Sequence, residues 1–323
     1  MERIAWGLIG CGDIAHRRVG PALRDLDTCR FVALARARAD QAAECARELG
    51  AERACLDWRE LVVDPEIQAV YIATPPHLHA EMAVAAAEAG KHVVCEKPMA
   101  PTVAEADAMI AACRQAGVRL SVAYYRHLYP AIARIREIIS AGEIGTPLLV
   151  QLHAFEFFDL PPDHPRRWLF EPEISGGGAL MDFGCHRIEV LLNLLGEPEE
   201  VRGLTGSGFS GRAVEDSAVA LLRFRQGALG LVTVSTVLEE PRDTLDIFGS
   251  KGALHVPALN RGLFTVRGAD GTREETYPCH ENLHLPYLQA VTAALLAGQA
   301  PPVSGEQGRE VTRVITEVYR QGR

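Results

Sequence analysis

The sequence predicts two parts, a doubly wound parallel α/β sheet followed by an α+β part with an open, mainly antiparallel sheet. In residues 1–122, short and nearly continuous apolar segments alternate with helical patterns. Strands buried on both faces of a parallel sheet give this pattern. In residues 123–323, apolar segments follow one another with turn residues between them, as in hairpins. We expect the C-terminal helices to be able to pack back on the first part.

The first part supports this class element by element. Each expected strand is a short apolar run, and several expected helices end at or before a glycine. The expected strands are 3–9, 31–34, a short segment near Ala54, 69–73, 92–95 and 119–122. The expected helices are 15–26, 40–49, 79–89 and 103–116.

The second part mixes helices with a run of strands. A proline-rich loop at 159–165 interrupts it, and the pairs at 226–227 and 251–252 mark turns. The expected helices are 131–140, 180–195, 285–297 and 306–319. The expected strands are 148–157, 217–224, 229–237, 244–248 and 253–256.

Composition narrows the possible partners of this chain. Its 323 residues carry a net charge of −9, which provides no basic field for nucleic acid or an anionic membrane. We find no apolar run of membrane-spanning length and no signal-peptide pattern at the start. The eight cysteines are scattered without a Cys-x-x-Cys pair, so we expect a cytoplasmic protein without disulfides.

The segment 10–15 reads Gly-Cys-Gly-Asp-Ile-Ala, a G-x-G-x-x-A turn between an expected strand and an expected helix. This context is typical of a Rossmann dinucleotide site. Gly10 permits the tight turn, Gly12 lets the backbone approach a pyrophosphate, and Asp13 and Ile14 open the helix whose free N–H groups face the phosphates. The alternative is a glycine-rich turn without a ligand.

The end of the second strand bears on the choice of dinucleotide. NAD-specific enzymes usually carry Asp or Glu there, whereas this strand continues with Arg36 and Arg38. Arginine can pair with the extra phosphate of NADP. We therefore expect NADP rather than NAD, with two solvated loop charges as the alternative.

Several motifs in this order resemble the glucose-fructose oxidoreductase/inositol dehydrogenase/MocA family of NAD(P)-dependent oxidoreductases. The resemblance covers nearly the whole chain and implies oxidation or reduction of a sugar, cyclitol or related alcohol. It also implies a sheet in the second domain that forms oligomer contacts, as in a homo-dimer or homo-tetramer. The segments that carry it are 7–15, 73–81, 89–98, 142–145 and 176–186.

Lys97 matches the family's catalytic lysine in a Glu-Lys-Pro motif. It follows an apolar strand at the carboxyl edge of the expected sheet, where ligands bind in such folds. A lysine there can donate to a substrate oxygen and stabilise an alkoxide. Glu96 either pairs with another residue or orients the loop. The resemblance implies cofactor contacts from Thr74, Pro75, His77, Glu96 and Lys97.

Asp182 and His186 match a second family pair and lie four residues apart on an expected helix, so they share one face. The polar stripe continues through Glu189 and Asn193, and we expect it to face a cleft. Histidine can exchange protons near neutral pH, and Asp182 can orient the ring or hold a hydroxyl. The alternative is a structural ion pair.

The substrate contacts that we expect are Tyr124, Tyr125, Arg126, Arg167 and Trp168. The family resemblance implies that the first three line the pocket, while the arginine and tryptophan of the proline-rich region suit hydroxyls and a sugar face. Packing and surface roles are equally compatible with these residue types. His153, His164, His280 and His284 lack metal-ligand spacing, so we expect no metal.

The sequence therefore predicts an NADP-dependent dehydrogenase or reductase of a polyhydroxylated small molecule. His186 would carry the hydroxyl proton while Lys97 polarises the oxygen. Three alternatives stay open. They are a dinucleotide-dependent glycosidase that works through transient oxidation, a non-catalytic redox sensor that only binds the dinucleotide, and a noncatalytic partner of another enzyme.

Overall fold

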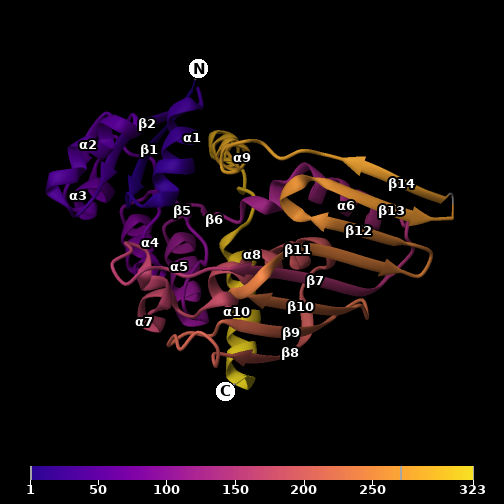
Figure 1. Ribbon diagram of the computed structural model, residues 1–323. Coiled ribbons are helices and arrows are strands. Elements are labelled where there is room, and N and C mark those ends of the chain that lie inside the picture. The colour runs from indigo at the N-terminus through magenta and orange to yellow at the C-terminus, as the bar shows by residue number, and fades with distance from the viewer. Residues whose placement is uncertain (1, 270, 323) are drawn as a thin grey trace. The chain divides into compact units, whose positions relative to one another are not determined.

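The computed structural model describes residues 2–269 and 271–322 (Figure 1). The chain divides into two compact units. The first unit runs to Tyr125 and also contains His280–Arg309, and the second contains Arg126–Cys279 and the residues from Glu310 on. From the sequence, we expected the boundary between the two domains after residue 122 and residues 280–309 in the second domain.

The first unit is built on a six-stranded parallel sheet, as the sequence predicted. The strand order is β3-β2-β1-β4-β5-β6, so successive strands are added on one side of β1 up to β3 and on its other side from β4 on, and all pairs are parallel. Every residue of β1 and β4 is buried, because helices cover both faces. The strands are β1 (Ile4–Ile9), β2 (Cys29–Ala35), β3 (Arg53–Cys55), β4 (Ala69–Ile72), β5 (His92–Cys95) and β6 (Leu120–Val122).

The helices of this unit fall into two groups. Helix α1 contacts α2 and α9, whereas α4 contacts α3 and α5. Gly50 ends α2 with φ +84°, and Thr102 starts α5 with a capping box to Glu105. The helices are α1 (Gly20–Asp25), α2 (Ala39–Leu49), α3 (Trp58–Val63), α4 (His79–Glu88), α5 (Val103–Gln115) and α9 (Leu285–Leu296).

Two short turns of helix stand before α1 and α4, a π-helical turn η1 (Ala15–Val19) and a 3₁₀ turn η2 (Pro76–Leu78). A single helix over 15–26 was therefore only partly correct, and α3 was not expected at all. The six residues of α3 contain two apolar positions facing the core, Leu61 and Val62, which is too few to show a helical period.

The second unit is built on an eight-stranded sheet in the order β14-β13-β12-β11-β7-β10-β9-β8. Its pairs are antiparallel except that β10 lies parallel to β7. The strands are β7 (Pro147–Phe157), β8 (Pro198–Gly206), β9 (Ser217–Phe224), β10 (Leu229–Ser235), β11 (Val237–Gly249), β12 (Ala253–Ala258), β13 (Leu263–Gly268) and β14 (Gly271–Thr276).

Strands β8, β13 and β14 were not predicted from the sequence. The edge strand β14 is Gly-Thr-Arg-Glu-Glu-Thr, with five of its six residues exposed, so it lacks the apolar alternation that identifies a strand. The parallel pair was also missed, because hairpins were expected throughout. It arises because β7 lies between β10 and β11, which are consecutive in the chain.

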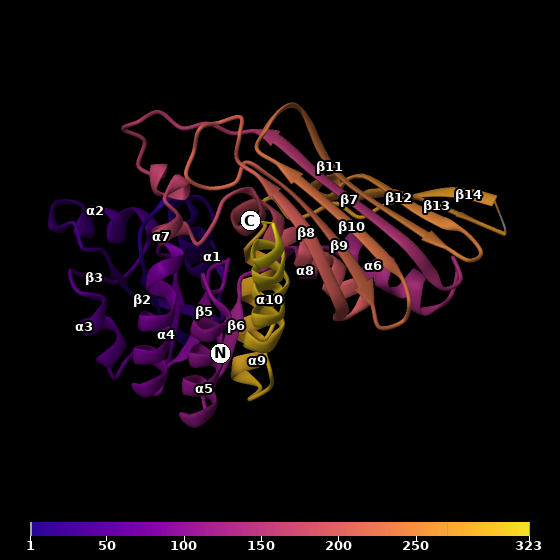
Figure 2. The ribbon, with the colours of Figure 1, turned by 90° about the horizontal axis from the view of Figure 1, so that it is seen from below.

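Helices α6 and α8 lie on the same face of this sheet (Figure 2). The strand residues that point to the helix side are buried, for example Leu152, Leu222 and Val232. The helices and helical turns are η3 (Tyr125–Leu128), α6 (Pro130–Ser140), η4 (Arg167–Phe170), α7 (Pro172–Ser175), η5 (Leu180–Gly184), α8 (Cys185–Leu195), η6 (Leu259–Arg261) and α10 (Gly305–Gln321). Among the described residues, no helix combines the length and the apolar character needed to cross a membrane.

Candidate active site

The glycine turn lies at the point where the strand order of the first unit reverses. Gly10 follows β1, and a Cβ built on it would lie 2.5 Å from the carbonyl oxygen of Ala73, which follows β4. Its φ of +98° also requires glycine. A Cβ on Gly12, in contrast, would meet no described atom within 4 Å. The residues after the turn are the ion-paired Asp13, with Arg17 at 2.8 Å, and the half-buried Ile14.

These features fit a dinucleotide. The open side of Gly12 leaves room for a pyrophosphate against the backbone, and the switch point of a doubly wound sheet is where such ligands bind. The turn leads into a π-helical turn, Ala15–Val19. Turns of this kind are frequent at functional sites. Gly10 and Gly12 would therefore hold the phosphates, and a bound nicotinamide dinucleotide would supply the redox chemistry.

The two arginines after β2 have different surroundings. Arg36 donates to the carbonyl oxygen of Cys11 at 3.2 Å and to Sγ of Cys45 at 2.8 Å, and it also bonds Gln41. Its guanidinium is thus held against the glycine turn. Arg38 is exposed and precedes α2 in an extended conformation.

Glu96 is buried, and its side chain binds other parts of the first unit. Its Oε1 accepts from Tyr71 Oη at 2.7 Å and faces His284 Nε2 at 3.1 Å, while its Oε2 accepts from the backbone N–H of Lys97 at 3.1 Å. The side chain of Lys97 is half-buried directly after this anchor. The carboxylate thus pairs with Tyr71 and His284 and also holds the backbone that carries the lysine, while its contact with a cofactor stays a prediction.

A buried histidine joins this loop to the one after β4. His79 Nδ1 lies 3.1 Å from the carbonyl oxygen of Pro98, and Nε2 lies 2.9 Å from that of Thr74. Burial lowers the pKa of His79, although the carbonyl contacts oppose this. The ring thus ties Thr74 and the half-buried Pro75 to the Lys97 loop, and His77 is exposed in η2. Sequence reasoning missed His79, because a structural histidine has no spacing signal.

The tyrosines expected to contact substrate are largely buried. Tyr124 is inaccessible, and the ring of Tyr125 lies 4.6 Å from that of His284, with the guanidinium of Arg18 5.3 Å from its centre. Arg126 begins the second unit and is also buried. Their role in substrate binding stays a prediction.

Asp182 and His186 lie on one continuous helical segment of the second unit, as expected. Asp182 is in the π-helical turn η5, and His186 is buried in the first turn of α8. Of the two π-helical turns among the described residues, η5 contains the predicted residue Asp182, whereas η1 begins directly after the predicted residue Ile14. Extra residues in a helix re-aim side chains, which is why such turns recur at sites.

The remainder of the polar stripe does not face a cleft. Glu189 Oε1 lies 2.6 Å from Nδ1 of His127, and Asn193 binds the carbonyl oxygen of His127 and a guanidinium N–H of Arg136. Burial raises the pKa of Glu189, although the bond from His127 opposes it. Helix α6 and turn η3 cover this half of the stripe. The expectation that the stripe faces a cleft is therefore wrong for Glu189 and Asn193.

Additional charged groups near Asp182 and His186 were not predicted from the sequence. Arg187 is buried, donates to Asp243 at 2.9 Å and lies over the ring of Phe183 at 3.8 Å. Glu156 on β7 is half-buried and has a raised pKa, chiefly because of desolvation, although the charge of Arg187 opposes the shift and the charges of Asp182 and Asp243 add to it. Only strand pairing brings these residues to α8, so no local pattern could reveal them.

Arg167 lines a cavity of about 640 Å³ in the second unit. It donates to the carbonyl oxygen of Leu160 at 2.5 Å, and its guanidinium lies 5.7 Å from the ring centre of Phe170. Trp168 is half-buried in the same 3₁₀ turn and is not among the residues that line this cavity.

Comparison with known proteins agrees with this geometry. Residues 4–124 match the model of an oxidoreductase family with an NAD-binding Rossmann fold, and residues 132–255 match the GFO/IDH/MocA C-terminal domain. The chain is 32% identical to 1,5-anhydro-D-fructose reductase of Ensifer adhaerens, over 94% of this chain and 91% of that relative.

Two further matches concern levoglucosan dehydrogenase. The chain is 36% identical to that of Pseudarthrobacter phenanthrenivorans over 68% of its own length, and this match spans 63% of the relative. A solved levoglucosan dehydrogenase in complex with NADH and levoglucosan superposes with a TM-score of 0.91 at 28% identity, covering 99% of this chain and 97% of that one. The chain is therefore an oxidoreductase enzyme of the GFO/IDH/MocA family, with an NAD-binding Rossmann fold over residues 4–124.

Proposed function

We propose that this enzyme catalyses the NADP-dependent oxidation of a carbinol group, or the reverse reduction, on a sugar, cyclitol or related polyhydroxylated molecule. The observation that carries the proposal is the anchored loop after β5. Glu96 fixes the backbone of Lys97 at the carboxyl edge of the parallel sheet, the edge at which the glycine turn also lies. The relatives named for levoglucosan and 1,5-anhydro-D-fructose support a substrate of this class.

The proposed roles follow from the side chains themselves. Lys97 donates to the substrate oxygen and stabilises the charge that develops on it. His186 accepts or returns the hydroxyl proton, and Asp182 orients that imidazole or holds a neighbouring hydroxyl. Tyr124, Tyr125, Arg126, Arg167 and Trp168 are proposed substrate contacts. Thr74, Pro75 and His77 are proposed to contact the dinucleotide, and Glu96 to act chiefly by positioning Lys97.

The preference for NADP rests on Arg36 and Arg38. β2 ends at Ala35 and is followed by two arginines without an acid in between, and Arg36 already lies against the glycine turn. A guanidinium suits the 2′-phosphate of NADP, whereas NAD would need a carboxylate for its ribose hydroxyls.

A panel of polyols, inositols and ketoses with each dinucleotide tests the reaction, with the absorbance of the reduced nicotinamide as the readout. We expect turnover in the wild type, its abolition by Lys97→Ala with dinucleotide binding retained, and no change in Lys251→Ala, an exposed lysine of the second unit. Full turnover in Lys97→Ala would refute the assigned role. Retention of a tightly bound cofactor without net nicotinamide change would indicate a glycosidase.

The dinucleotide preference has its own test. Arg36→Ala should raise the KM for NADP roughly 10-fold, as expected for one lost charge-assisted hydrogen bond, and leave the KM for NAD nearly unchanged. Arg47→Ala, whose arginine is exposed on α2 and paired with Glu44, is the matched control. A wild type that uses NAD better than NADP with every substrate would overturn this preference.

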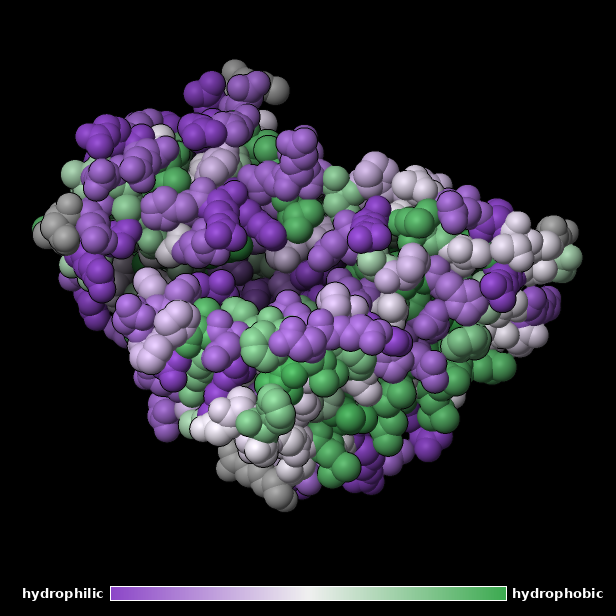
Figure 3. All heavy atoms as spheres, in the orientation of Figure 1, coloured by the Kyte–Doolittle hydropathy of each residue, from purple (hydrophilic) through white to green (hydrophobic). Residues whose placement is uncertain are grey.

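We also propose a homo-dimer or homo-tetramer that forms through the outer face of the eight-stranded sheet. Several exposed apolar side chains lie on this face. Leu204 is paired with Val219 across neighbouring strands, and Leu229 is paired with Leu149, and residues paired in this way point to the same face of a sheet. Leu221 is 52% exposed on the same face. Figure 3 shows a continuous apolar surface over β8–β10, and such surfaces commonly mark protein interfaces.

A reducing compartment, the cytoplasm, is proposed from the cysteines. All eight are free thiols, and six of them are buried. Buried reduced cysteines pack as small apolar side chains, which an oxidising compartment would not favour.

A further inference from the structure

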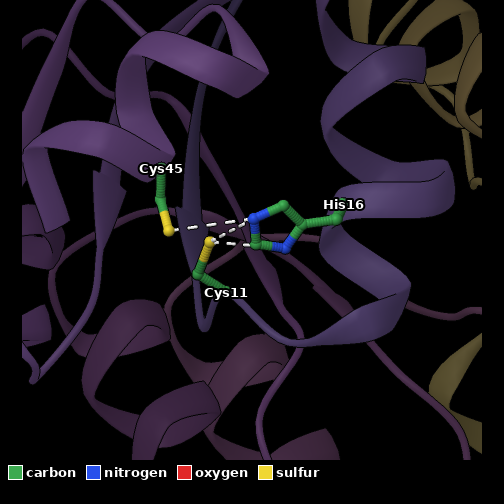
Figure 4. A group of neighbouring side chains, drawn as sticks. All are labelled: Cys11, His16 and Cys45. Atoms are coloured by element: carbon green, nitrogen blue, oxygen red, sulfur yellow. Dashed lines mark hydrogen bonds between the residues drawn. The ribbon is translucent and has the colours of Figure 1, made fainter. Parts of the chain in front are cut away.

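We propose that Cys11, His16 and Cys45 form a binding site for a thiophilic divalent ion, with Zn²⁺ as the best chemical match. Figure 4 shows both sulfur atoms directed at the ring of His16. One ligand atom from each residue lies within 4.8 Å of the others. The three come from the glycine turn, from the π-helical turn that follows it and from α2.

The distances match the coordination geometry of zinc. His16 Nε2 lies 3.8 Å from Sγ of Cys11 and 3.8 Å from Sγ of Cys45. Bonds of about 2.3 Å to sulfur and about 2.0 Å to nitrogen at tetrahedral angles place these atoms about 3.5 Å apart. The two nitrogen-to-sulfur distances therefore exceed the tetrahedral value by only a few tenths of an ångström, and the two sulfurs lie within 4.8 Å of one another.

The orientation of the histidine ring also suits a ligand. Nδ1 lies 3.0 Å from the carbonyl oxygen of Gly12, which can only accept, so Nδ1 carries the proton. The lone pair is then on Nε2, which lies 3.8 Å from both sulfurs, although Sγ of Cys11 is also 3.8 Å from Nδ1. Metal-binding histidines are commonly held in this way, by an N–H bond from the other ring nitrogen to a carbonyl.

The charges around the site balance. Two thiolates would neutralise a divalent ion, and Arg36 donates to Cys45 Sγ at 2.8 Å. Glu48 Oε2 lies 3.7 Å from Nε2 and offsets the guanidinium charge. Two sulfurs and one imidazole select zinc or cobalt over magnesium or calcium.

Spacing along the sequence did not reveal this site, and no metal was expected from it. Cys11 and His16 form no recognised metal motif with any nearby cysteine. Cys45 reaches them only because α2 packs beside α1 and the glycine turn.

Cobalt titration of the full chain, chelator-treated and kept reduced, tests the proposal. We expect one equivalent of Co²⁺ to give sulfur-to-cobalt charge-transfer absorption and tetrahedral visible bands, and an equal amount of Zn²⁺ to displace it. Cys45→Ser and His16→Ala should weaken binding about 100-fold or more, beyond the 10- to 100-fold loss typical of outer contacts. Cys55→Ser, at a buried cysteine of β3, should bind like the wild type.

Two results would overturn the site. One is the absence of charge-transfer absorption in the wild type, and the other is an unchanged spectrum in both Cys45→Ser and His16→Ala. The side chain of His16 is 35% exposed, so His16→Ala should keep its fold even if Cys45→Ser unfolds, as circular dichroism would show. The measurement uses no substrate or dinucleotide, and its failure is therefore distinct from failure of the proposed reaction.

Discussion

His284 Nε2 lies 3.1 Å from Oε1 of Glu96, although 188 residues separate the two in the chain. Both side chains are buried, and Tyr71 donates to the same oxygen. Burial alone would raise the pKa of Glu96, but His284, Tyr71 and the charge of Lys97 together lower it below its usual value. A permanent carboxylate therefore accepts the backbone N–H of Lys97 at its other oxygen.

We expect Glu96→Gln to lower kcat by about 10-fold or more, because the charge-assisted bonds that fix the Lys97 loop are worth roughly 1.5–3 kcal/mol. The KM for the dinucleotide should change by less than about threefold, corresponding to roughly 0.7 kcal/mol. Steady-state kinetics give this split between kcat and KM, which general unfolding would not produce. Glu88→Gln, at the exposed end of α4, is the control. An unchanged kcat and pH profile in Glu96→Gln would remove the positioning role.

The two glycines of the turn should respond differently to alanine. Gly10→Ala places a Cβ 2.5 Å from a carbonyl oxygen at a φ of +98°, and we expect it to destabilise the fold by about 1–3 kcal/mol. In Gly12→Ala the Cβ meets no described atom, so stability should stay within about 0.5 kcal/mol of the wild type.

Dinucleotide affinity separates these variants further. Gly12→Ala should weaken binding about 10-fold or more, about 1.4 kcal/mol, because the new methyl group occupies the space that a pyrophosphate needs. Calorimetric titration with NADPH, alongside thermal melts of the free protein, measures both properties. Wild-type affinity in Gly12→Ala would show that the phosphates do not lie against this residue.

A charge on the outer face of the large sheet should disrupt the proposed oligomer. Leu221→Glu introduces a carboxylate among apolar side chains of that face, and burying it at an interface would cost several kcal/mol. We expect light scattering after size exclusion to show a smaller species than the wild type. Val63→Glu, at a residue 71% exposed in the first unit, should not change the mass. A wild type that is already monomeric would end this proposal.

Acid should selectively weaken the contact between α6 and β14. Glu275 accepts from Arg134 at 2.9 Å and from Arg273 at 2.8 Å, and these bonds lower its pKa from 4.5 to about 2. A lowered pKa in the folded state adds stability that is complete above the unfolded value near 4.5 and is lost as the pH falls towards about 2.

In denaturant unfolding at pH 7, where the carboxylate bonds of the wild type are intact, the free energy of unfolding of Glu275→Gln should therefore be about 1–2 kcal/mol lower than that of the wild type. The difference from the wild type should shrink steadily between pH 5 and pH 3. Glu274→Gln, at the exposed neighbour, should match the wild type throughout. If the difference in free energy of unfolding between the wild type and Glu275→Gln does not depend on pH, the ion pair does not stabilise the fold.

Local sequence patterns determined the parallel strands of the first unit and its glycine turn. An apolar run marks a buried strand, and backbone geometry requires glycine at Gly10, so each can be recognised from a few adjacent residues. The placement of Asp182 and His186 on one helical segment was equally local, but the π-helical turn that contains Asp182 was not predicted from the sequence.

Tertiary structure alone decided the contacts between distant segments. Strand β14 exists because β13 pairs with it, and its polar sequence has no strand signal. His284 reaches Glu96, and Cys45 reaches Cys11, only after the chain has folded back on itself. The hydrophobic periodicity of a helix or strand and the conformation of a turn can be predicted from adjacent residues. The partner of a buried polar side chain, in contrast, depends on which distant segments pack together.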